Sequence, residues 1–505
     1  MTLKTLVIGL DGATWNLLQP LSEEGKLPTI TQLMVKGCYG NLESCIPPVT
    51  FPAWKCYSSG KNPGKLGVYW WMRPDFQSSN MKTNSSIDFK GMEIWDYLNH
   101  YGITCGVLGM PTTYPVKEIK RFIVSELCTT KKRATYPKNL QYELEEKFSY
   151  MNEFVDYHGE DREAMLAKAI NLIQQRFDAA RYLAHKYDPD FLHLTVFHID
   201  SIQHFFWSYM RDHHPKYGRV LEQTWKMLDA NMGKLLDETK PEYVFIMSDH
   251  GFVESKGYFN SALWLLIRGY LQLKSYPLNV LLKFAPNLFH SIKTISNRLL
   301  DFILLGYERQ NQRKLKDVML WSQIDWRRSR IIAFPQGLFF FNQTHFRSNF
   351  EYERKLKYLL NKLQEVRHPI TGKKAFAQVY RRTDIYTGEY IQNAPDIVVL
   401  PNEGFDVGAN FNKLWYFPRE EGWSAVHKLH GIFIATGPKI RKGLKIEGVK
   451  IYDLAPTIMH IFGLPIPSDI DGRVLKEIFE TDSELSKKKP VYVDPIHYEK
   501  MNQSE

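Results

Sequence analysis

The chain has 505 residues, of which 44% are hydrophobic and 14% aromatic, and its Lys and Arg exceed Asp and Glu to give a formal net charge of +10. This composition supports a large buried core and excludes a chain dominated by disorder. The basic excess suits anionic partners such as phosphate esters, nucleotides or acidic lipid headgroups, although an ordinary cationic surface has the same balance.

The cysteines and the absence of targeting patterns further limit the class of protein that we expect. The five cysteines form no C-x-x-C motif, which argues against a disulfide framework or a cysteine-rich zinc site. No apolar run approaches the ~20 residues that a membrane-spanning helix needs, and no signal-peptide pattern precedes the first strand. We therefore expect a cytoplasmic protein. Lys and Arg are spread along the chain, so no nucleic-acid partner is expected.

Short apolar runs, each followed by a helical pattern, recur along the chain and indicate strands. They cover residues 3–10, 102–109, 191–197, 243–247, 397–400 and 432–435. Continuous Val, Ile and Leu runs separated by helices favour a parallel sheet that is covered on both faces. The predicted fold class is therefore α/β, with a mostly parallel central sheet flanked by helices.

The α/β rhythm breaks at residues 261–325, where amphipathic segments are interleaved with Lys and Arg. We predict a helical cap insertion there, a discontinuous core formed by residues 1–260 and 326–480, and a polar C-terminal tail at 481–505. A cap that packs its apolar face on the core is the main interpretation. The alternative is a surface that makes peripheral contact with a membrane or a lipid substrate. Oligomeric state stays open.

An aspartate follows each of three predicted strands. Asp11 follows the first strand, Asp200 follows the run at 191–197, and Asp249 follows the run at 243–247. In open α/β sheets, ligands bind outside the carboxyl ends of the strands, so three aspartates at such ends predict a site. A single strand-end Asp is more often a helix cap or a turn residue. Three such aspartates, two of them with a nearby His, favour a functional site over structural roles.

Histidines accompany two of these aspartates. Asp200 and His204 are four residues apart at the start of a predicted helix, which places both side chains on one helical face. A carboxylate with an imidazole suits Zn²⁺, although a surface pair has the same spacing. Asp249 and His250 are adjacent, and Gly251 is expected to allow the turn that brings both to one metal. The alternative is a helix-capping Asp beside a partly buried His.

Two further features are candidates for the same site. Thr50 precedes Pro52, which the first turn of a helix tolerates, so Thr50 would lie at a helix N-terminus, where backbone N–H groups favour anions. An N-cap threonine is the alternative. His427 and His430 lie just before the last predicted strand. Either histidine could complete a metal site, and their spacing does not separate them.

The ordered set of motifs resembles the alkaline phosphatase superfamily, in particular its type I phosphodiesterase/nucleotide pyrophosphatase family. VIGLDGATW resembles the opening strand with its first metal aspartate, and PPVTFPAWKCYSSGKNPGKLG resembles the nucleophile segment and the turn after it. YDLAPTIMHIFGLPIP, followed by Asp471-Gly472, resembles the closing helix and turn. The resemblance runs from about residue 3 to about residue 475, and it implies an alkaline-phosphatase-like core.

The resemblance also implies a ligand set and a reaction. Two divalent metal ions, expected to be Zn²⁺, would bind a small phosphate ester such as a nucleotide, a lipid headgroup or a sugar phosphate. His427 is preferred to His430 because it precedes Gly431 by four residues, as in the family pattern H-R-x-x-G. Thr50 would be the nucleophile and would form a phosphothreonine intermediate. The implied ligands of one metal are Asp200, His204 and His427, and those of the other are Asp11, Asp249, His250 and the Thr50 oxygen.

The sequence departs from the family at two positions after the nucleophile. Leu66 stands where N-P-x-x-H-G has its His, and Trp71 stands where nucleotide pyrophosphatases have an Asn that contacts a phosphate oxygen. The phosphate-oxygen partner is therefore unassigned. A phosphomonoesterase or a phosphoryl transferase on the same site remains an alternative, and a non-catalytic lipid- or anion-binding protein is an alternative of a different class.

Overall fold

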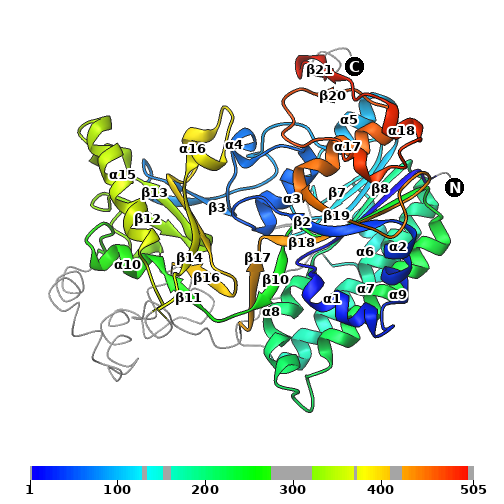
Figure 1. Cartoon of the computed structure of the whole chain (residues 1–505), viewed down its shortest axis with the longest axis horizontal. Coiled ribbons are helices and arrows are strands. Elements are labelled where there is room, and N and C mark those ends of the chain that lie inside the picture. Colours follow the sequence, from blue (N-terminus) through cyan, green and yellow to red (C-terminus); the bar gives the residue numbers. More distant parts are fainter. Residues whose placement is uncertain are drawn as a thin grey trace.

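Buried strands rich in Val, Ile and Leu form the centre of the larger of two lobes (Figure 1). The computed structural model describes residues 3–127, 133–151, 161–274, 321–368, 372–409 and 423–498. A nine-stranded sheet in the order β19-β2-β18-β9-β1-β8-β5-β6-β7 spans the larger lobe. Its strands are β1 (Thr5–Leu10), β2 (Cys38–Glu43), β5 (Cys105–Met110), β6 (Arg121–Ser125), β7 (Thr135–Tyr136), β8 (Phe191–Val196), β9 (Tyr243–Met247), β18 (His430–Thr436) and β19 (Leu444–Lys450).

The middle of this sheet is parallel. β1 lies between β8 and β9, with Thr5 opposite Phe191 on one side and Tyr243 on the other. β5 continues the parallel order beyond β8, whereas β18 and β7 run antiparallel to their neighbours. The mostly parallel central sheet predicted from the apolar runs is confirmed.

Helices cover both faces of the sheet because successive strand side chains point to opposite sides. In β1, Leu6 and Ile8 face one hydrophobic cluster and Val7 faces the other. The helices on the first face are α1 (Trp15–Glu23), α2 (Pro28–Lys36), α6 (Leu140–Phe148), α7 (Arg162–Tyr187), α8 (His198–Arg211) and α9 (Val220–Thr239). Those on the second face are α3 (Thr50–Ser59), α5 (Ile94–His100) and α17 (Leu454–Ile461) (Figure 1).

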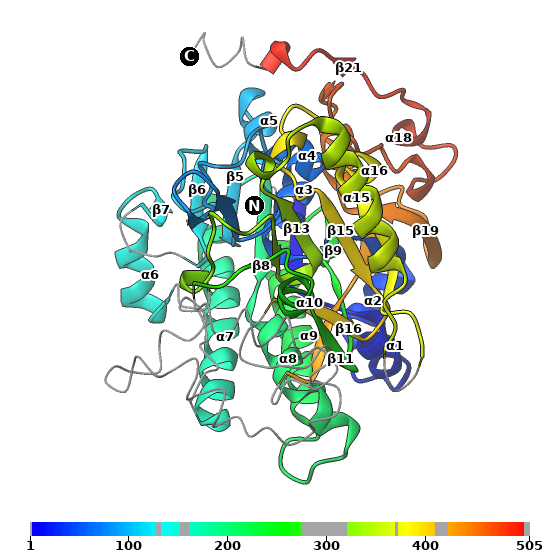
Figure 2. The same cartoon turned by 90° about the vertical axis from the view of Figure 1, so that its left-hand side faces the viewer.

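The smaller lobe contains a second, antiparallel sheet in the order β12-β13-β15-β14. The predicted strand at 397–400 is present, but it belongs to this sheet rather than to the central one. α15 packs on the sheet, as Figure 2 shows from the side of this lobe. The elements are α10 (Ser261–Ile267), β12 (Ile331–Phe334), β13 (Leu338–Phe341), α15 (Asn349–Gln364), β14 (Phe376–Arg381), α16 (Arg382–Ile385) and β15 (Ile397–Pro401).

Short strand pairs join the two lobes. The segment after β9 forms β10 (Gly251–Glu254), which pairs with β17 (Ala425–Lys428), and then β11 (Gly257–Asn260), which pairs with β16 (Phe405–Gly408). After α3, the chain forms α4 (Pro63–Leu66) and the hairpin of β3 (Met72–Asp75) and β4 (Asn80–Thr83). These connections place β10 and β17 between the lobes (Figure 1).

The structure describes only part of the predicted cap and most of the predicted tail. Residues 275–320 of the predicted cap lie outside the described residues, so the helical cap stays a prediction. Part of the predicted tail is ordered: α18 (Glu484–Lys487) is followed by β21 (Tyr492–Val493), which pairs with β20 (Ile466–Pro467). Tyr498 is buried in the core. None of the helices in the described part of the chain is long and apolar enough to cross a membrane.

Candidate active site

The three predicted aspartates lie at one edge of the central sheet. Asp11 directly follows β1, Asp249 follows β9 by two residues, and Asp200 lies in the first turn of α8, which follows β8. Because β8, β1 and β9 are parallel neighbours, their carboxyl ends meet. The backbone N–H of Gly12 donates to Asp249 Oδ1 at 3.1 Å and ties two of these strand ends together.

Thr50 begins α3, as the position of Pro52 predicted. Val49 is extended, and the helical conformation starts at the next residue. The Thr50 side chain is buried, and its Oγ1 lies 3.2 Å from His250 Nε2. The candidate nucleophile therefore sits at a helix N-terminus, where the helix dipole favours an anionic group.

His250 Nε2 is the centre of the site. It lies 3.2 Å from Asp249 Oδ2, 3.5 Å from Asp11 Oδ1 and 4.0 Å from Asp200 Oδ1. The glycine after it serves a different purpose from the one predicted. Gly251 does not adopt a positive φ; instead, a Cβ there would lie 2.0 Å from the carbonyl oxygen of His430. Glycine is needed for close approach of two strands rather than for a turn.

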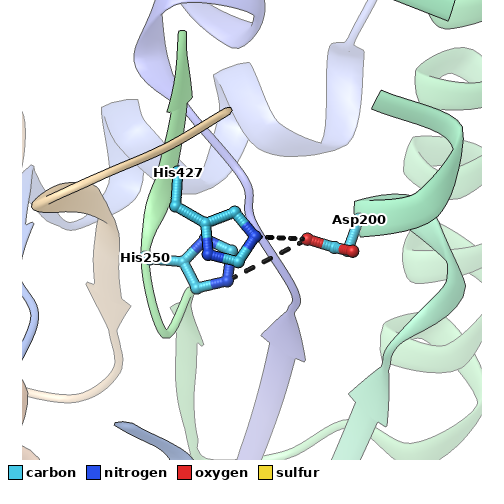
Figure 3. Close-up of side chains that lie close together, drawn as sticks. All are labelled: Asp200, His250 and His427. Atoms are coloured by element: carbon cyan, nitrogen blue, oxygen red, sulfur yellow. Dashed lines mark ion pairs between the residues drawn. The ribbon is translucent and has the colours of Figure 1, made fainter. Parts of the chain in front are cut away.

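His427 joins the site from β17. Its Nε2 lies 3.2 Å from Asp200 Oδ1 and 3.2 Å from His204 Nε2, and its ring stacks on His250 with centroids 3.6 Å apart (Figure 3). His204 Nε2 is 3.5 Å from Asp200 Oδ2, so the i,i+4 pair shares one helical face as predicted. His430 is exposed at the start of β18. The structure thus brings His427 to the aspartates.

Backbone carbonyls set the tautomer of each histidine. The Nδ1–H of His204 donates to Ala425 O at 2.7 Å, that of His427 to Pro48 O at 3.1 Å, and that of His250 to Gly251 O at 3.2 Å. A carbonyl oxygen can only accept, so Nδ1 carries the proton in each neutral ring. The lone pair of every Nε2 therefore faces the site, which is how metal-binding imidazoles are oriented.

This arrangement of lone pairs fits divalent cations. Within the described residues, Asp11 Oδ1, Asp200 Oδ1 and Asp249 Oδ2 are buried side-chain oxygens without a hydrogen-bond partner. The Nε2 atoms of His204 and His427 also face each other. Buried, unpartnered acceptors at such distances are unfavourable unless a cation lies among them. Two groups have ligand atoms within 4.8 Å of one another: Asp200 with His250 and His427, and Asp11 with Asp249 and His250.

Burial and mutual repulsion perturb the carboxylates on the β1 and β9 side. Burial raises the pKa of Asp249 to about 7, and burial together with the charge of Asp249 raises the pKa of Asp11. Burial lowers the pKa of His204 to about 4 and also lowers that of His250. A bound cation opposes the shifts of both carboxyl groups because it favours their charged forms.

Asp200 and His427 behave as a pair. Burial alone would raise the pKa of Asp200, but attraction to His204 and His427 outweighs it, and the pKa falls. Burial would lower the pKa of His427, but its interaction with Asp200 outweighs burial and the pKa rises. Asp200 therefore stays ionised and can bind a positive charge.

The two positions that depart from the family pattern carry no polar group to the nucleophile. Leu66 is fully buried, and Trp71 packs on Phe51 with ring centroids 4.5 Å apart. Phe51 also contacts Phe89 at 5.1 Å. An aromatic cluster thus lies next to Thr50.

Sequence reasoning missed two residues near the site. The indole N–H of Trp54 donates to Asp11 Oδ2 at 3.0 Å. Asp406, on β16, is close enough for its charge to act on His427. The spacing of Trp54, one helical turn after Thr50, was a usable signal because i and i+4 share a helix face. Nothing local marks Asp406, whose position depends on the pairing of distant strands.

The model of the type I phosphodiesterase/nucleotide pyrophosphatase family matches residues 5–431. The chain belongs to this family. It is therefore a hydrolase that acts on phosphoric ester bonds, and the resemblance to this family is confirmed. The family match includes the segments that carry all seven site residues. No curated protein matches the chain at a significant level.

Solved structures share the fold of this family member. Human ectonucleotide pyrophosphatase/phosphodiesterase 5 is 15% identical, with a TM-score of 0.51 over 91% of this chain and 95% of that one. The murine protein, in an inactive variant with alanine in place of a threonine and in complex with AMP, is 14% identical. Its TM-score is 0.51, and the match covers 95% of this chain and 100% of the murine one. Phosphonoacetate hydrolase from Sinorhizobium meliloti, in complex with phosphonoacetate, is 12% identical, with a TM-score of 0.55 over 90% and 94%.

Proposed function

We propose that this protein is a two-metal phosphodiesterase or phosphohydrolase that forms a phosphothreonine intermediate on Thr50. One observation carries the proposal: the unpartnered oxygens of three aspartates and the Nε2 lone pairs of three histidines converge beside a threonine at a helix N-terminus. The proposed ligands are the predicted ones, Asp200, His204 and His427 for one ion and Asp11, Asp249, His250 and Thr50 for the other. Imidazole ligands favour Zn²⁺ over Mg²⁺.

The protein side chains orient and charge the site. When bound, two divalent ions would neutralise charge on the phosphoryl oxygens and lower the pKa of the Thr50 hydroxyl. The backbone carbonyls that accept from each Nδ1–H keep the three imidazole rings fixed. Three carboxylates do not fully balance two divalent ions, so the loaded site keeps a positive charge that attracts an anionic ester.

Thr50 Oγ1 forms a bond to phosphorus as the bond from phosphorus to the leaving-group oxygen breaks. The leaving group departs with the bonding electron pair and takes up a proton, which balances the proton that Thr50 Oγ1 loses. The N-terminus of α3 stabilises negative charge on the phosphoryl group during this step. Water then attacks phosphorus, the bond to Thr50 Oγ1 breaks, and the threonine hydroxyl is restored.

We infer that the substrate is a small phosphate ester. The murine relative binds AMP and the bacterial one binds phosphonoacetate, both of which are small anions. In this chain, the aromatic contact of Trp71 with Phe51 lies beside the nucleophile. A cavity of about 710 Å³ beside β3 is lined by Arg73, Lys90 and Arg382 together with Asp88 and Asp396. Its size suits a small, polar molecule.

The proposal is tested by metal analysis and by hydrolysis of two chromogenic esters. The zinc-loaded protein is expected to contain two zinc ions and to release p-nitrophenol from bis-p-nitrophenyl phosphate. Thr50→Ala should abolish turnover and retain zinc. Thr224→Ala is the matched control because Thr224 is equally buried, in α9, away from the site. Unchanged turnover in Thr50→Ala would refute the nucleophile.

The same assay distinguishes the alternatives. Faster hydrolysis of p-nitrophenyl phosphate than of the diester would indicate a phosphomonoesterase. Product formation only in the presence of an alcohol acceptor would indicate a phosphoryl transferase. Stoichiometric zinc without turnover of either ester would favour a narrower natural substrate, whereas absence of bound metal would contradict the proposal.

A further inference from the structure

Trp54 contacts a proposed metal ligand from the helix that carries the nucleophile. It lies one turn after Thr50 in α3 and is fully buried. Its indole N–H donates to Asp11 Oδ2 at 3.0 Å. The other carboxylate oxygen, Oδ1, has no hydrogen-bond partner in the described part of the chain and lies 3.5 Å from His250 Nε2. One oxygen of Asp11 is thus held by the indole, and the other faces the site.

The indole is held in one orientation by its surroundings. A Cβ on Gly9, two residues before Asp11, would lie 2.4 Å from Trp54 Cη2, so the ring packs directly against the backbone of β1. The rings of Tyr57 and His193 meet Trp54 edge-on, each with centroids 6.1 Å apart. A side chain enclosed in this way cannot change rotamer without moving a strand or two other rings. This packing directs the N–H at Asp11.

We propose that Trp54 is a positioning residue that selects which oxygen of Asp11 binds metal, an inference that rests on the proposed two-metal function. A carboxylate with two free oxygens can rotate, bind both oxygens to one ion or accept a proton. A hydrogen bond to Oδ2 removes that freedom and favours the ionised carboxylate, which leaves Oδ1 as a single, directed ligand. Because Trp54 and Thr50 share α3, the same helix fixes the nucleophile and a ligand of the ion that would activate it.

A second buried tryptophan, Trp95, provides a matched control. Trp95, in α5, is also fully buried and belongs to the same hydrophobic cluster as Trp54. Its Nε1 has no hydrogen-bond partner within the residues that the structure describes. Replacing either residue with Phe removes an indole N–H and the same volume from one core. Only Trp54→Phe removes a hydrogen bond to a proposed ligand.

The experiment is a zinc titration of the metal-free protein in competition with a chromogenic chelator. Trp54→Phe is expected to weaken one of the two zinc sites by about 10- to 100-fold, the range for partners that orient metal ligands. Trp95→Phe should leave both sites unchanged. In the double variant Asp11→Asn/Trp54→Phe, the loss should not exceed that of Asp11→Asn alone, because the indole acts through Asp11. The zinc concentration for half-maximal activity should rise in Trp54→Phe, with kcat recovering at saturating zinc.

A second replacement separates the N–H group from packing. 3-Benzothienylalanine has the shape of tryptophan but no N–H, and its incorporation at position 54 or 95 preserves the core where Phe prevents folding. Weaker zinc binding for position 54 alone supports the inference. Equal zinc affinity of the two replaced proteins, or equal losses in the two Phe variants, would show that Trp54 only fills space. A wild-type protein that binds no zinc would overturn the proposed function as well.

Discussion

Replacing His427 with alanine, with His430→Ala as the control, tests the ligand assignment that the structure favours. The two histidines are three positions apart, and both lie near residue 431, where the family match ends. His427 Nε2 lies 3.2 Å from Asp200 Oδ1, whereas His430 is exposed. The two variants therefore differ only in whether a side chain is taken from the site.

The magnitude follows from the number of ligands. Structural zinc sites with four protein ligands bind with about 10–16 kcal/mol, so each ligand contributes about 3 kcal/mol. Loss of His427 should weaken one zinc site by about 100-fold, since every 1.4 kcal/mol corresponds to about tenfold in affinity. His430→Ala should change neither site. Competitive zinc titration and kcat/KM for bis-p-nitrophenyl phosphate measure the effect.

The metal-free proteins make the test sharper. In the absence of metal, the Nε2 lone pairs of His204 and His427 face each other at 3.2 Å. Removing His427 relieves this contact but also removes the attraction to Asp200, so the metal-free His427→Ala protein should have a Tm close to that of the wild type, while the zinc-loaded variant melts earlier. Equal zinc affinities for His427→Ala and the wild type, or a large loss of stability in the metal-free variant, would refute the reasoning and make His427 a structural residue.

Three further predictions concern stability. Removing metal with a chelator should lower Tm. Zinc at a thousandfold excess over Kd should restore about 4 kcal/mol of unfolding free energy. A Tm that changes with neither treatment would contradict the metal site. Burial lowers the pKa of His193 to about 3 from an ordinary 6.5, so the unfolded chain binds a proton that the fold excludes. The free energy of unfolding should therefore fall as pH drops from 6.5 towards 3, by up to about 1.4 kcal/mol per pH unit, and His193→Gln should reduce that slope in urea titrations; an unchanged slope would mean that another group causes it. Glu126 and Arg176 form a fully buried ion pair, so Glu126→Gln should cost about 3–5 kcal/mol in denaturant unfolding, against less than about 1 kcal/mol for Asp178→Asn, which breaks the partly exposed pair with Arg181. Similar losses of unfolding free energy in the two variants would contradict this prediction.

The residues whose positions follow from local rules could be predicted from the sequence. Asp11, Asp200 and Asp249 each follow a strand within a few residues, and parallel neighbouring strands bring their carboxyl ends together. The spacing of Asp200 and His204 follows from helix geometry, and Pro52 marks the start of α3. Each of these inferences needs only a few neighbouring residues.

Features that depend on distant pairing could not be read from the sequence. His427 reaches the site because β17 pairs with β10, which sets His427 opposite Phe252; no spacing between His427 and His430 encodes that register. The run at 397–400 has the composition of a central strand, yet its partners are β13 and β14. A buried apolar strand shows that a sheet is present but does not identify which sheet it joins.

The most direct test of the central claim is a search for phosphate on Thr50. The zinc-loaded protein is mixed with excess bis-p-nitrophenyl phosphate, quenched in acid within one turnover, digested and analysed by mass spectrometry. We expect a phosphoryl group on Thr50 in the peptide that contains the start of α3, and none in Thr50→Ala. An active enzyme whose quenched Thr50 carries no phosphate at any time within the turnover, or whose phosphate lies on another residue, would contradict this claim.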